Sequence, residues 1–349
     1  MRRKVRVAAV AFGALAVCTG VWAWTLSQSP YKGFTGEVFY ELKRGTGTGA
    51  MARELAAAGV VKTPWHFLAA RLTRPRVALQ AGEYRFQNEA SAAEVLDRIA
   101  RGDVYYVELT VPEGSNLFEI GELIERSGLG TAKEFRQAAA DATGIQDLSP
   151  GAVTLEGYLF PSTYQVGRRT DMKELCHRMT AEFRRVWKHL GGGAEVQTAV
   201  TLASLVEKET GVPEERALVA GVYRNRLEAG MRLECDPTVI YAALLEGRWR
   251  GAIHRSDLDR AHAYNTYRVA GLPPGPIANP GRASLEAALR PAETGAIYFV
   301  AKPDGSGRHV FSGTLAAHAR AVASYRRGTA RQRGGKAPAV AGRKKTRKR

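Results

Sequence analysis

The chain has 349 residues, of which 45% are hydrophobic and 24% charged, and its formal net charge is +17. Eleven positive charges lie in residues 326–349 and four in residues 1–6, so residues 7–325 carry only +2. We therefore expect no nucleic-acid binding by the folded body, because such binding requires a basic surface on the domain. The cysteine and histidine spacing matches no zinc site, and there is no glycine-rich phosphate loop. This predicts neither a metal nor a nucleotide cofactor.

An uncharged run of twenty residues, 7–26, follows the basic N-terminus. At about 1.5 Å per residue, a helix of this length crosses the hydrocarbon core of a bilayer. We therefore predict a membrane-spanning helix over residues 7–27, with residues 1–6 in the cytoplasm and the remaining chain in the periplasm. A buried or amphipathic helix is an alternative, but the run has no polar stripe.

Two further alternatives involve cleavage of this segment. A signal peptidase site is disfavoured by the exit sequence, which contains Trp22 and Trp24. Processing as a lipoprotein at Cys18 is disfavoured because Val17 stands where a small residue is expected.

Residues 28–112 are expected to form a small first subdomain. The run EVFYELKRG predicts a strand, Gly49–Gly59 a helix and ALQAGEYRF a second strand. A helix with Ser91 as its N-cap and a closing strand in VYYVELTVPEG follow. This βααβ-like order suits either a cell-wall-binding module or a spacer without a ligand.

Residues 113–325 predict a larger α+β domain, with helices at Leu117–Ser127 and Ala132–Ala142 and a hairpin that turns at Pro303–Gly307. In TLEGYLFPSTYQV, aromatic side chains surround Glu156. Such a cluster suits a sugar site, where rings stack on pyranoses, and equally suits an ordinary core. The loop Gly271–Gly281 is rich in proline and glycine, so its stiff backbone is expected to be held for a purpose other than core formation.

The helix that contains ASLVEKE is apolar nearly all round and ends with Glu207 and Glu209. Burial disfavours the charged form of a carboxylic acid, and a protonated acid near neutral pH is what glycosidic bond cleavage requires. Two residues apart on a helix, the side chains point about 160° from each other, so we expect them to occupy different sites. The alternative is a helix end that emerges into solvent, with Gly211 and Pro213 ending it.

Residues 326–349 contain no acidic residue, which predicts a disordered tail. The tail is either a solvated extension or a contact for anionic lipid or cell-wall polymer. Cys176 and Cys235 lie on the exported side, and the sequence does not decide whether they pair.

Five ordered blocks resemble the YceG-like family of endolytic murein transglycosylases. They are EGYLFPSTY, ASLVEKE, NRLEAGMRLECDPTVIY, AYNTYRVAGLPPGPIANPG and HVFSGTLAAH. The resemblance spans essentially the whole chain and implies one membrane anchor, a LysM-like subdomain and a YceG-like catalytic domain. Two positions depart from the family pattern: Ser162 replaces an acid after Phe-Pro, and Glu234-Cys235 replaces a more neutral pair before Asp-Pro.

The resemblance implies that the catalytic acid is Glu209, with Glu207 as the reserve candidate. The residues expected to bind substrate are polar or aromatic members of the matching blocks, namely Asn265, Tyr264, Thr266, Tyr158, Tyr241 and Asp236.

The reaction implied by the family is non-hydrolytic cleavage of the β-1,4 bond between N-acetylmuramic acid and N-acetylglucosamine, which leaves a 1,6-anhydro end. The expected partners are peptidoglycan strands and peptidoglycan synthases at the inner membrane, where the enzyme would terminate strand elongation. One alternative is a hydrolase that pairs Glu209 with Glu156 or Asp236. The other is a non-catalytic wall-binding membrane protein.

Overall fold

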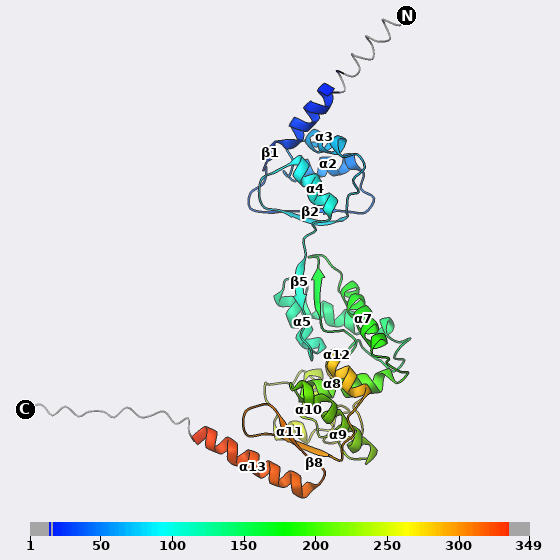
Figure 1. Cartoon of the computed structure of the whole chain (residues 1–349), viewed down its shortest axis with the longest axis vertical. Helices are drawn as coiled ribbons and strands as arrows, with labels where there is room; N and C mark the ends of the chain where they lie inside the picture. The colour runs from blue at the N-terminus through cyan, green and yellow to red at the C-terminus, as the bar shows by residue number, and fades with distance from the viewer. Residues whose placement is uncertain (1–13, 15–16, 335–349) are drawn as a thin grey trace, which may run out of the picture. The chain divides into compact units, whose positions relative to one another are not determined.

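The computed structural model describes residue 14 and residues 17–334, with side-chain surroundings up to residue 329. The chain divides into two compact units, Met1–Val107 and Glu108–Arg349. Both combine helices with short two-stranded sheets, as Figure 1 shows, so the predicted α+β class is confirmed.

The first unit is built on an antiparallel pair of strands, β2 (Val38–Leu42) and β3 (Gly82–Phe86). Helices α2 (Thr48–Ala57) and α3 (Pro64–Thr73) lie between these strands in the sequence, and α4 (Ala92–Arg101) follows them. Two very short strands, β1 (Pro30–Tyr31) and β4 (Ala90–Ser91), also pair antiparallel. The core consists mainly of apolar side chains from β2, β3 and the three helices, among them Leu55, Phe67, Tyr84, Leu96 and Ile99.

The strand β2, the helix α2 after it, the strand β3 and the helix α4 agree with the elements predicted for this part of the chain. Ser91 caps α4 as expected: its side chain accepts a hydrogen bond from the amide of Glu94, and the Glu94 carboxylate accepts one from the amide of Ser91. Helix α3 was not predicted. The predicted closing strand exists as β5 (Val107–Thr110), but it pairs with β6 (Thr163–Val166) of the second unit. The strand that pairs with β5 lies far away in the sequence, so a local sequence pattern predicts the strand but not its pairing partner.

Residues 17–28 are helical and lead into β1 after one intervening residue. Within the described part of the chain, no helix has both the length and the apolar character needed to cross a membrane. Residues 7–13, 15 and 16 of the predicted span lie outside the described residues.

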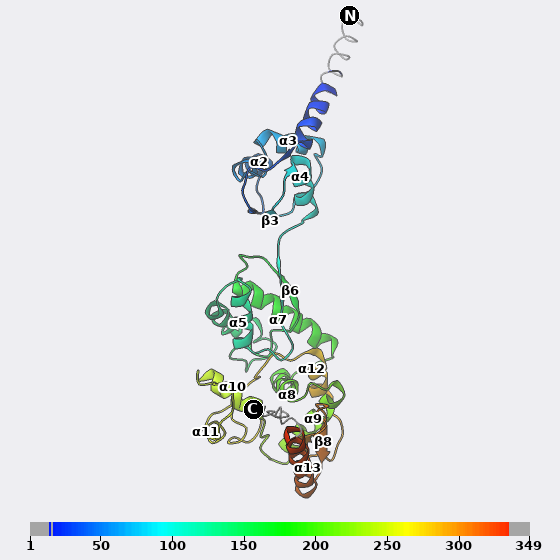
Figure 2. The same cartoon turned by 90° about the vertical axis from the view of Figure 1, so that its left-hand side faces the viewer.

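The second unit places one buried helix among several others. Helix α8 (Val196–Glu209) packs against α9 (Arg216–Glu228), α10 (Asp236–Leu245) and α12 (Arg282–Leu289). The remaining helical elements are α5 (Leu117–Arg126), α6 (Ala132–Ala139), η1 (Ala142–Gly144), α7 (Met172–His189), η2 (Pro213–Glu215), α11 (Arg255–Leu258) and α13 (Leu315–Gly334). Figure 2 shows α8 close to α9, α10 and α12.

Two further sequence predictions concern the end of this unit. The predicted hairpin is present as β7 (Tyr298–Ala301) paired with β8 (His309–Ser312). Residues 326–334 of the predicted disordered tail instead continue α13. Arginine, the most frequent residue in this stretch, is a strong helix former, so the helix propagates beyond the predicted boundary. Residues 335–349 lie outside the described part.

All three cysteines are free thiols in this structure. Cys176 is buried in α7 and Cys235 is buried immediately before α10, so no disulfide joins them.

Candidate active site

Helix α8 delivers two carboxylates to different surroundings at its C-terminal end. Its side chains are buried at Val196 and throughout residues 200–206, because apolar or small residues occupy nearly every face. The helix ends at Glu209, and Thr210 then adopts an extended backbone. Glu207 and Glu209 therefore leave the helix on separate sides, as the helical spacing predicts.

The Glu209 carboxylate accepts two hydrogen bonds on the same oxygen. The hydroxyl of Tyr223 in α9 donates to Oε2 over 3.1 Å, and the thiol of Cys235 donates to that oxygen over 3.4 Å. No described residue donates to Oε1. One oxygen of the acid is thus fixed by the protein, and the other is available to a substrate.

The electrostatics of this carboxyl favour a proton. Burial raises the pKa of Glu209, and the neighbouring charge of Asp236 raises it further. The donors from Cys235 and Tyr223 and the charge of His309 act in the opposite direction. Burial also raises the pKa of both donors, Tyr223 and Cys235, so each keeps its proton and continues to donate.

A strained turn brings Cys235 to this position. Glu234 has φ of 51°, a left-handed conformation that is uncommon for a residue with a side chain. Its amide donates to the Thr266 carbonyl, and the Cys235 amide donates to the Thr266 hydroxyl. Thr266 is almost fully buried and also shares a hydrogen bond with Thr238. It therefore holds the turn that carries Cys235.

Glu207, the reserve candidate, is bound by the protein on both of its oxygens. Oε2 accepts from the Gly281 amide over 2.9 Å, and Oε1 lies 3.5 Å from the guanidinium of Arg216. Its neighbour Lys208 donates to the carbonyl of Gly114. This side of α8 thus anchors the end of the Gly271–Gly281 loop.

Glu156 lies in the interior and has three donors. The Leu117 amide and the Tyr241 hydroxyl donate to one oxygen, over 3.0 and 2.9 Å, and the Asn279 side-chain amide donates to the other over 2.9 Å. Burial raises the pKa of Glu156 to about 8 in spite of these donors. The residue joins the start of α5, helix α10 and the proline-rich loop.

The three predicted tyrosines differ in exposure. Tyr158 is buried, donates or accepts a hydrogen bond with Ser149 and meets Phe183 edge to face. Tyr241 is buried, and its hydroxyl donates a hydrogen bond to the Glu156 carboxylate. Tyr264 is half-buried, with its ring 5.1 Å from that of Tyr241, and has the most accessible ring of the three.

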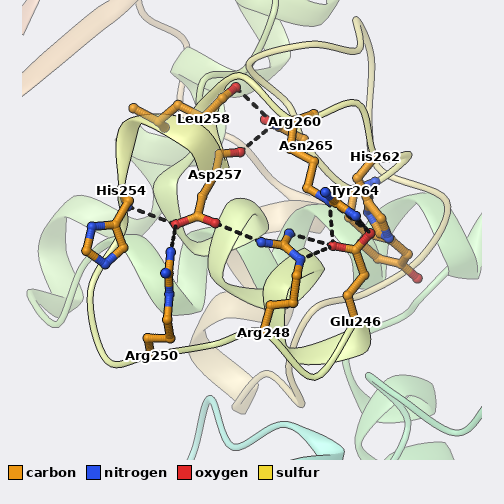
Figure 3. Close-up of polar contacts among 10 residues, drawn as sticks. All are labelled: Glu246, Arg248, Arg250, His254, Asp257, Leu258, Arg260, His262, Tyr264 and Asn265. Carbon is orange, nitrogen blue, oxygen red and sulfur yellow. Dashed lines mark hydrogen bonds and ion pairs between the residues drawn. The ribbon is translucent and has the colours of Figure 1, made fainter.

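Asn265 is also buried, and its side chain is fully engaged by its own loop. Its side-chain amide donates to the carbonyls of Asp257, Leu258 and Arg260 at 2.8–3.1 Å, and its side-chain oxygen accepts from the Tyr267 amide. Figure 3 shows the amide pointing into this turn.

An ion network supports the same loop, as Figure 3 shows. Arg248 lies between the carboxylates of Glu246 and Asp257, and Arg260 binds Glu246. Asp257 is buried and also accepts from the backbone amide of His254 over 2.9 Å. The network fixes the backbone that precedes Tyr264 and Asn265.

Asp236 is exposed at the start of α10 and accepts a hydrogen bond of 2.6 Å from the hydroxyl of Tyr267. Asp236 also lies near enough to Glu209 for its charge to raise the pKa of that acid. Among the residues predicted to bind substrate, Asp236 is therefore the one with a direct electrostatic effect on Glu209. Tyr223, Cys235 and Tyr267 were not predicted as site residues. Their proximity depends on how α9 and α10 pack on α8, and no local pattern signals it.

Two other features lie apart from Glu209. A hollow of about 470 Å³ in the same unit does not include α8; it is lined by Leu129, Gly130, Glu134, Gln137, Ala138 and residues 168–173. Among the described residues, no group of histidine, cysteine or acidic side chains is arranged to hold a metal ion.

Comparisons with known proteins cover most of the chain. The model of the YceG-like family matches residues 40–324. The endolytic murein transglycosylase of Bacillus subtilis (strain 168) is 32% identical over 302 residues, which cover 80% of this chain and 82% of that protein. The endolytic murein transglycosylase of Streptococcus pneumoniae serotype 2 (strain D39 / NCTC 7466) is 27% identical over 321 residues, which cover 81% of this chain and 57% of that protein.

A solved structure gives the same result for the fold. The crystal structure of a YceG-like protein from Listeria monocytogenes superposes with a TM-score of 0.52 at 28% identity. The match covers 81% of this chain and 98% of that one.

Proposed function

The chain belongs to the YceG-like family, and from this premise we propose that it is an endolytic murein transglycosylase whose catalytic acid is Glu209. The observation that carries the assignment of the acid is the asymmetric binding of its carboxyl. Two protein donors occupy Oε2, while Oε1 has none among the described residues. A carboxyl that is held by the protein through Oε2 can donate a proton from Oε1 to the substrate and later accept a proton on the same oxygen.

The reaction begins with the protonated acid. Burial raises the pKa of Glu209, which keeps a proton on the carboxyl for transfer to the glycosidic oxygen as the bond to muramoyl C1 breaks. The C6 hydroxyl of the same muramoyl residue then attacks C1, and the Glu209 carboxylate accepts the hydroxyl proton. The products are a 1,6-anhydromuramoyl end and a free 4-hydroxyl on the leaving N-acetylglucosamine, and Glu209 is protonated again.

The nucleophile in this mechanism belongs to the substrate, so no second carboxylate has to activate water. Intramolecular attack also gains from the high effective concentration of a neighbouring hydroxyl. Tyr223 and Cys235 stabilise the carboxylate that exists between the two proton transfers, because both donate to it.

A hydrolase remains the second candidate, because the charge of Asp236 reaches Glu209. Digestion of purified glycan strands with the full-length protein in detergent separates the two candidates. Internal fragments that end in 1,6-anhydromuramic acid, identified by mass spectrometry, support the transglycosylase. Reducing ends would establish hydrolysis and direct attention to Asp236. Binding without cleavage would leave a non-catalytic wall-binding protein.

Within this proposal, the substrate contacts are expected around Glu209 on the exposed side of the unit. Asp236 and Tyr264 are the candidates with accessible side chains. Asn265 and Thr266 hold their loop through the hydrogen bonds described above. Tyr158 and Tyr241 are buried, and their hydroxyls bond to Ser149 and Glu156. We propose that these four residues affect substrate binding through the shape of the site.

We further propose that residues 7–27 anchor the protein in the inner membrane and that the first unit acts as a LysM-like subdomain. The catalytic unit would then reach newly made strands beside peptidoglycan synthases and terminate their elongation.

We expect Tyr223→Phe to move the alkaline limb of the pH–activity profile to higher pH and to lower turnover roughly tenfold. The hydroxyl donates to the carboxylate form, so its loss raises the pKa of Glu209 further and leaves the carboxylate intermediate less stable. The measurement is turnover of glycan strands as a function of pH.

Cys235 provides a matched pair of controls. Cys235→Ala should shift the profile in the same direction as Tyr223→Phe, whereas Cys235→Ser should retain the wild-type profile, because a hydroxyl still donates. Profiles that do not move in Tyr223→Phe or Cys235→Ala would show that these contacts do not tune the acid.

A further inference from the structure

The outer face of α3, in the first unit, is apolar and exposed. Trp65 and Leu72 are each 68% exposed, and Leu68, half-buried between them, also packs against the core. On the opposite face, Phe67 and Ala70 are fully buried in the core. The helix is therefore apolar on both sides, although only one side faces the protein. A second apolar face that includes a large aromatic ring indicates an external contact.

The helix of residues 17–28 ends close to α3. In both views, α3 lies beside the last turns of that helix (Figures 1 and 2). Ala23 and Ser27 are buried, which fixes one side of the helix against the protein, whereas Trp22 and Trp24 are 56% and 58% exposed. The helix of residues 17–28 and the neighbouring α3 thus carry three exposed tryptophans, Trp22, Trp24 and Trp65.

The connection between the helix and the first unit is short. One residue separates the helix from β1, and β1 pairs with β4, which leads directly into α4. The first unit is therefore tied to the end of the helix without a flexible linker.

The segment that carries this face is basic. Residues 62–76 contain Lys62, Arg71, Arg74 and Arg76 and no acidic residue. Lys62 and Arg76 are exposed on either side of α3, whereas Arg74 pairs with Asp97 of α4. An apolar stripe flanked by exposed cations matches the chemistry of an anionic membrane surface, where tryptophan lies at the headgroup level and cations meet lipid phosphates.

We propose that the outer face of α3 lies on the anionic membrane surface, with Trp65 and Leu72 inserted at the boundary between headgroups and acyl chains. The inference rests on the anchor proposed above and adds a second, peripheral contact. A spanning helix over residues 7–27 places its exit at the headgroup level. The direct connection through β1 then keeps α3 at the same level, so the membrane fixes the orientation of the first unit as well as its attachment.

Two other occupants could cover an exposed tryptophan, namely a sugar ring and a second copy of the chain. Sugar binding requires polar groups around the aromatic ring to meet hydroxyls, whereas the residues that follow Trp65 at helical spacing on α3, Leu68, Ala69 and Leu72, are apolar. A second copy would bring the basic segments of both copies together, which is unfavourable. Both occupants are outcomes of the test below.

The test uses the full-length protein in vesicles of phosphatidylglycerol and phosphatidylethanolamine, with lipids brominated in the upper part of the acyl chain. Bromine quenches tryptophan fluorescence on contact. We expect Trp65→Phe to reduce the quenched amplitude by roughly a third, because three tryptophans lie at the interface. Trp249→Phe, in the second unit, is the matched control and should leave the quenched amplitude unchanged. Vesicles of phosphatidylcholine alone should quench Trp65 less, because they lack the anionic charge.

A quenched amplitude that is the same with and without Trp65 overturns the proposal. Cross-linking of Trp65→Cys between copies in the vesicles would then assign the face to a dimer, and a change in Trp65 fluorescence with glycan strands would assign it to sugar. Alkaline carbonate extraction of the same vesicles tests the anchor separately. Protein that is extracted by carbonate but still shows Trp65 quenching would refute the anchor and retain the surface contact.

Discussion

Glu209→Gln is expected to abolish cleavage of glycan strands, with a fall in turnover of at least about 10³-fold, because the amide has no proton to give and cannot accept one from the C6 hydroxyl. The amide oxygen still accepts from Tyr223 and Cys235, so the fold should be retained. Thermal unfolding should show a Tm no lower than that of the wild type, since the substitution removes a buried ionisable group. The measurement is the yield of 1,6-anhydromuramoyl ends, followed by mass spectrometry.

Glu207→Gln is the matched control, two residues away on the same helix. Its amide oxygen can keep the hydrogen bond from Gly281, and the open Oε1 of Glu209 is unaffected. We expect activity within about tenfold of the wild type, together with a modest loss of stability because the ion pair between Glu207 and Arg216 is lost. If Glu207→Gln were inactive and Glu209→Gln active, the acid would be Glu207 and the roles proposed for Tyr223 and Cys235 would fall.

The course of α8 and the separation of its two carboxylates could be predicted from the sequence, because they depend on one helical period. Apolar residues at nearly every position predicted a buried helix, and the two-residue spacing placed Glu207 and Glu209 on different sides. The β7–β8 hairpin and the Ser91 cap were predictable for the same reason: each depends on a few consecutive residues.

The surroundings of Glu209 could not be predicted in this way. Tyr223 and Cys235 reach it from elements that meet α8 only in the folded unit, and Cys235 depends on the left-handed backbone of Glu234. The sequence could not distinguish residues that face a substrate from residues that hold a loop. Asn265 has the polar side chain expected of a sugar contact, yet three carbonyls of its own loop accept its amide hydrogens.

Glu156→Ala is expected to destabilise the second unit by about 3–5 kcal/mol when unfolding is measured near pH 5. The substitution removes the acceptor of the Leu117 amide, the hydrogen-bond partner of the Tyr241 hydroxyl and one of the two acceptors of the Asn279 side-chain amide, which keeps the Ser115 carbonyl. For a unit of this size, the loss corresponds to a fall in Tm of roughly 10 °C. Urea unfolding at equilibrium measures it directly. Glu122→Ala, on the exposed side of α5, is the control and should change stability by less than about 0.5 kcal/mol.

The cost of Glu156→Ala should also depend on pH. Burial raises the pKa of Glu156 to about 8 in the folded state, from an unfolded value near 4.5, so folding favours the neutral acid. Its contribution to stability is therefore present in full below about pH 4.5 and is lost as the pH rises through about 8. The difference in unfolding free energy between the wild type and Glu156→Ala should accordingly narrow by a few kcal/mol between these limits. The hydroxyl of Tyr241 can accept the proton of the neutral acid as readily as it donates to the anion, which makes the protonated state compatible with the observed contacts. A difference that widens with rising pH would mean that the three donors outweigh burial and hold Glu156 as an anion.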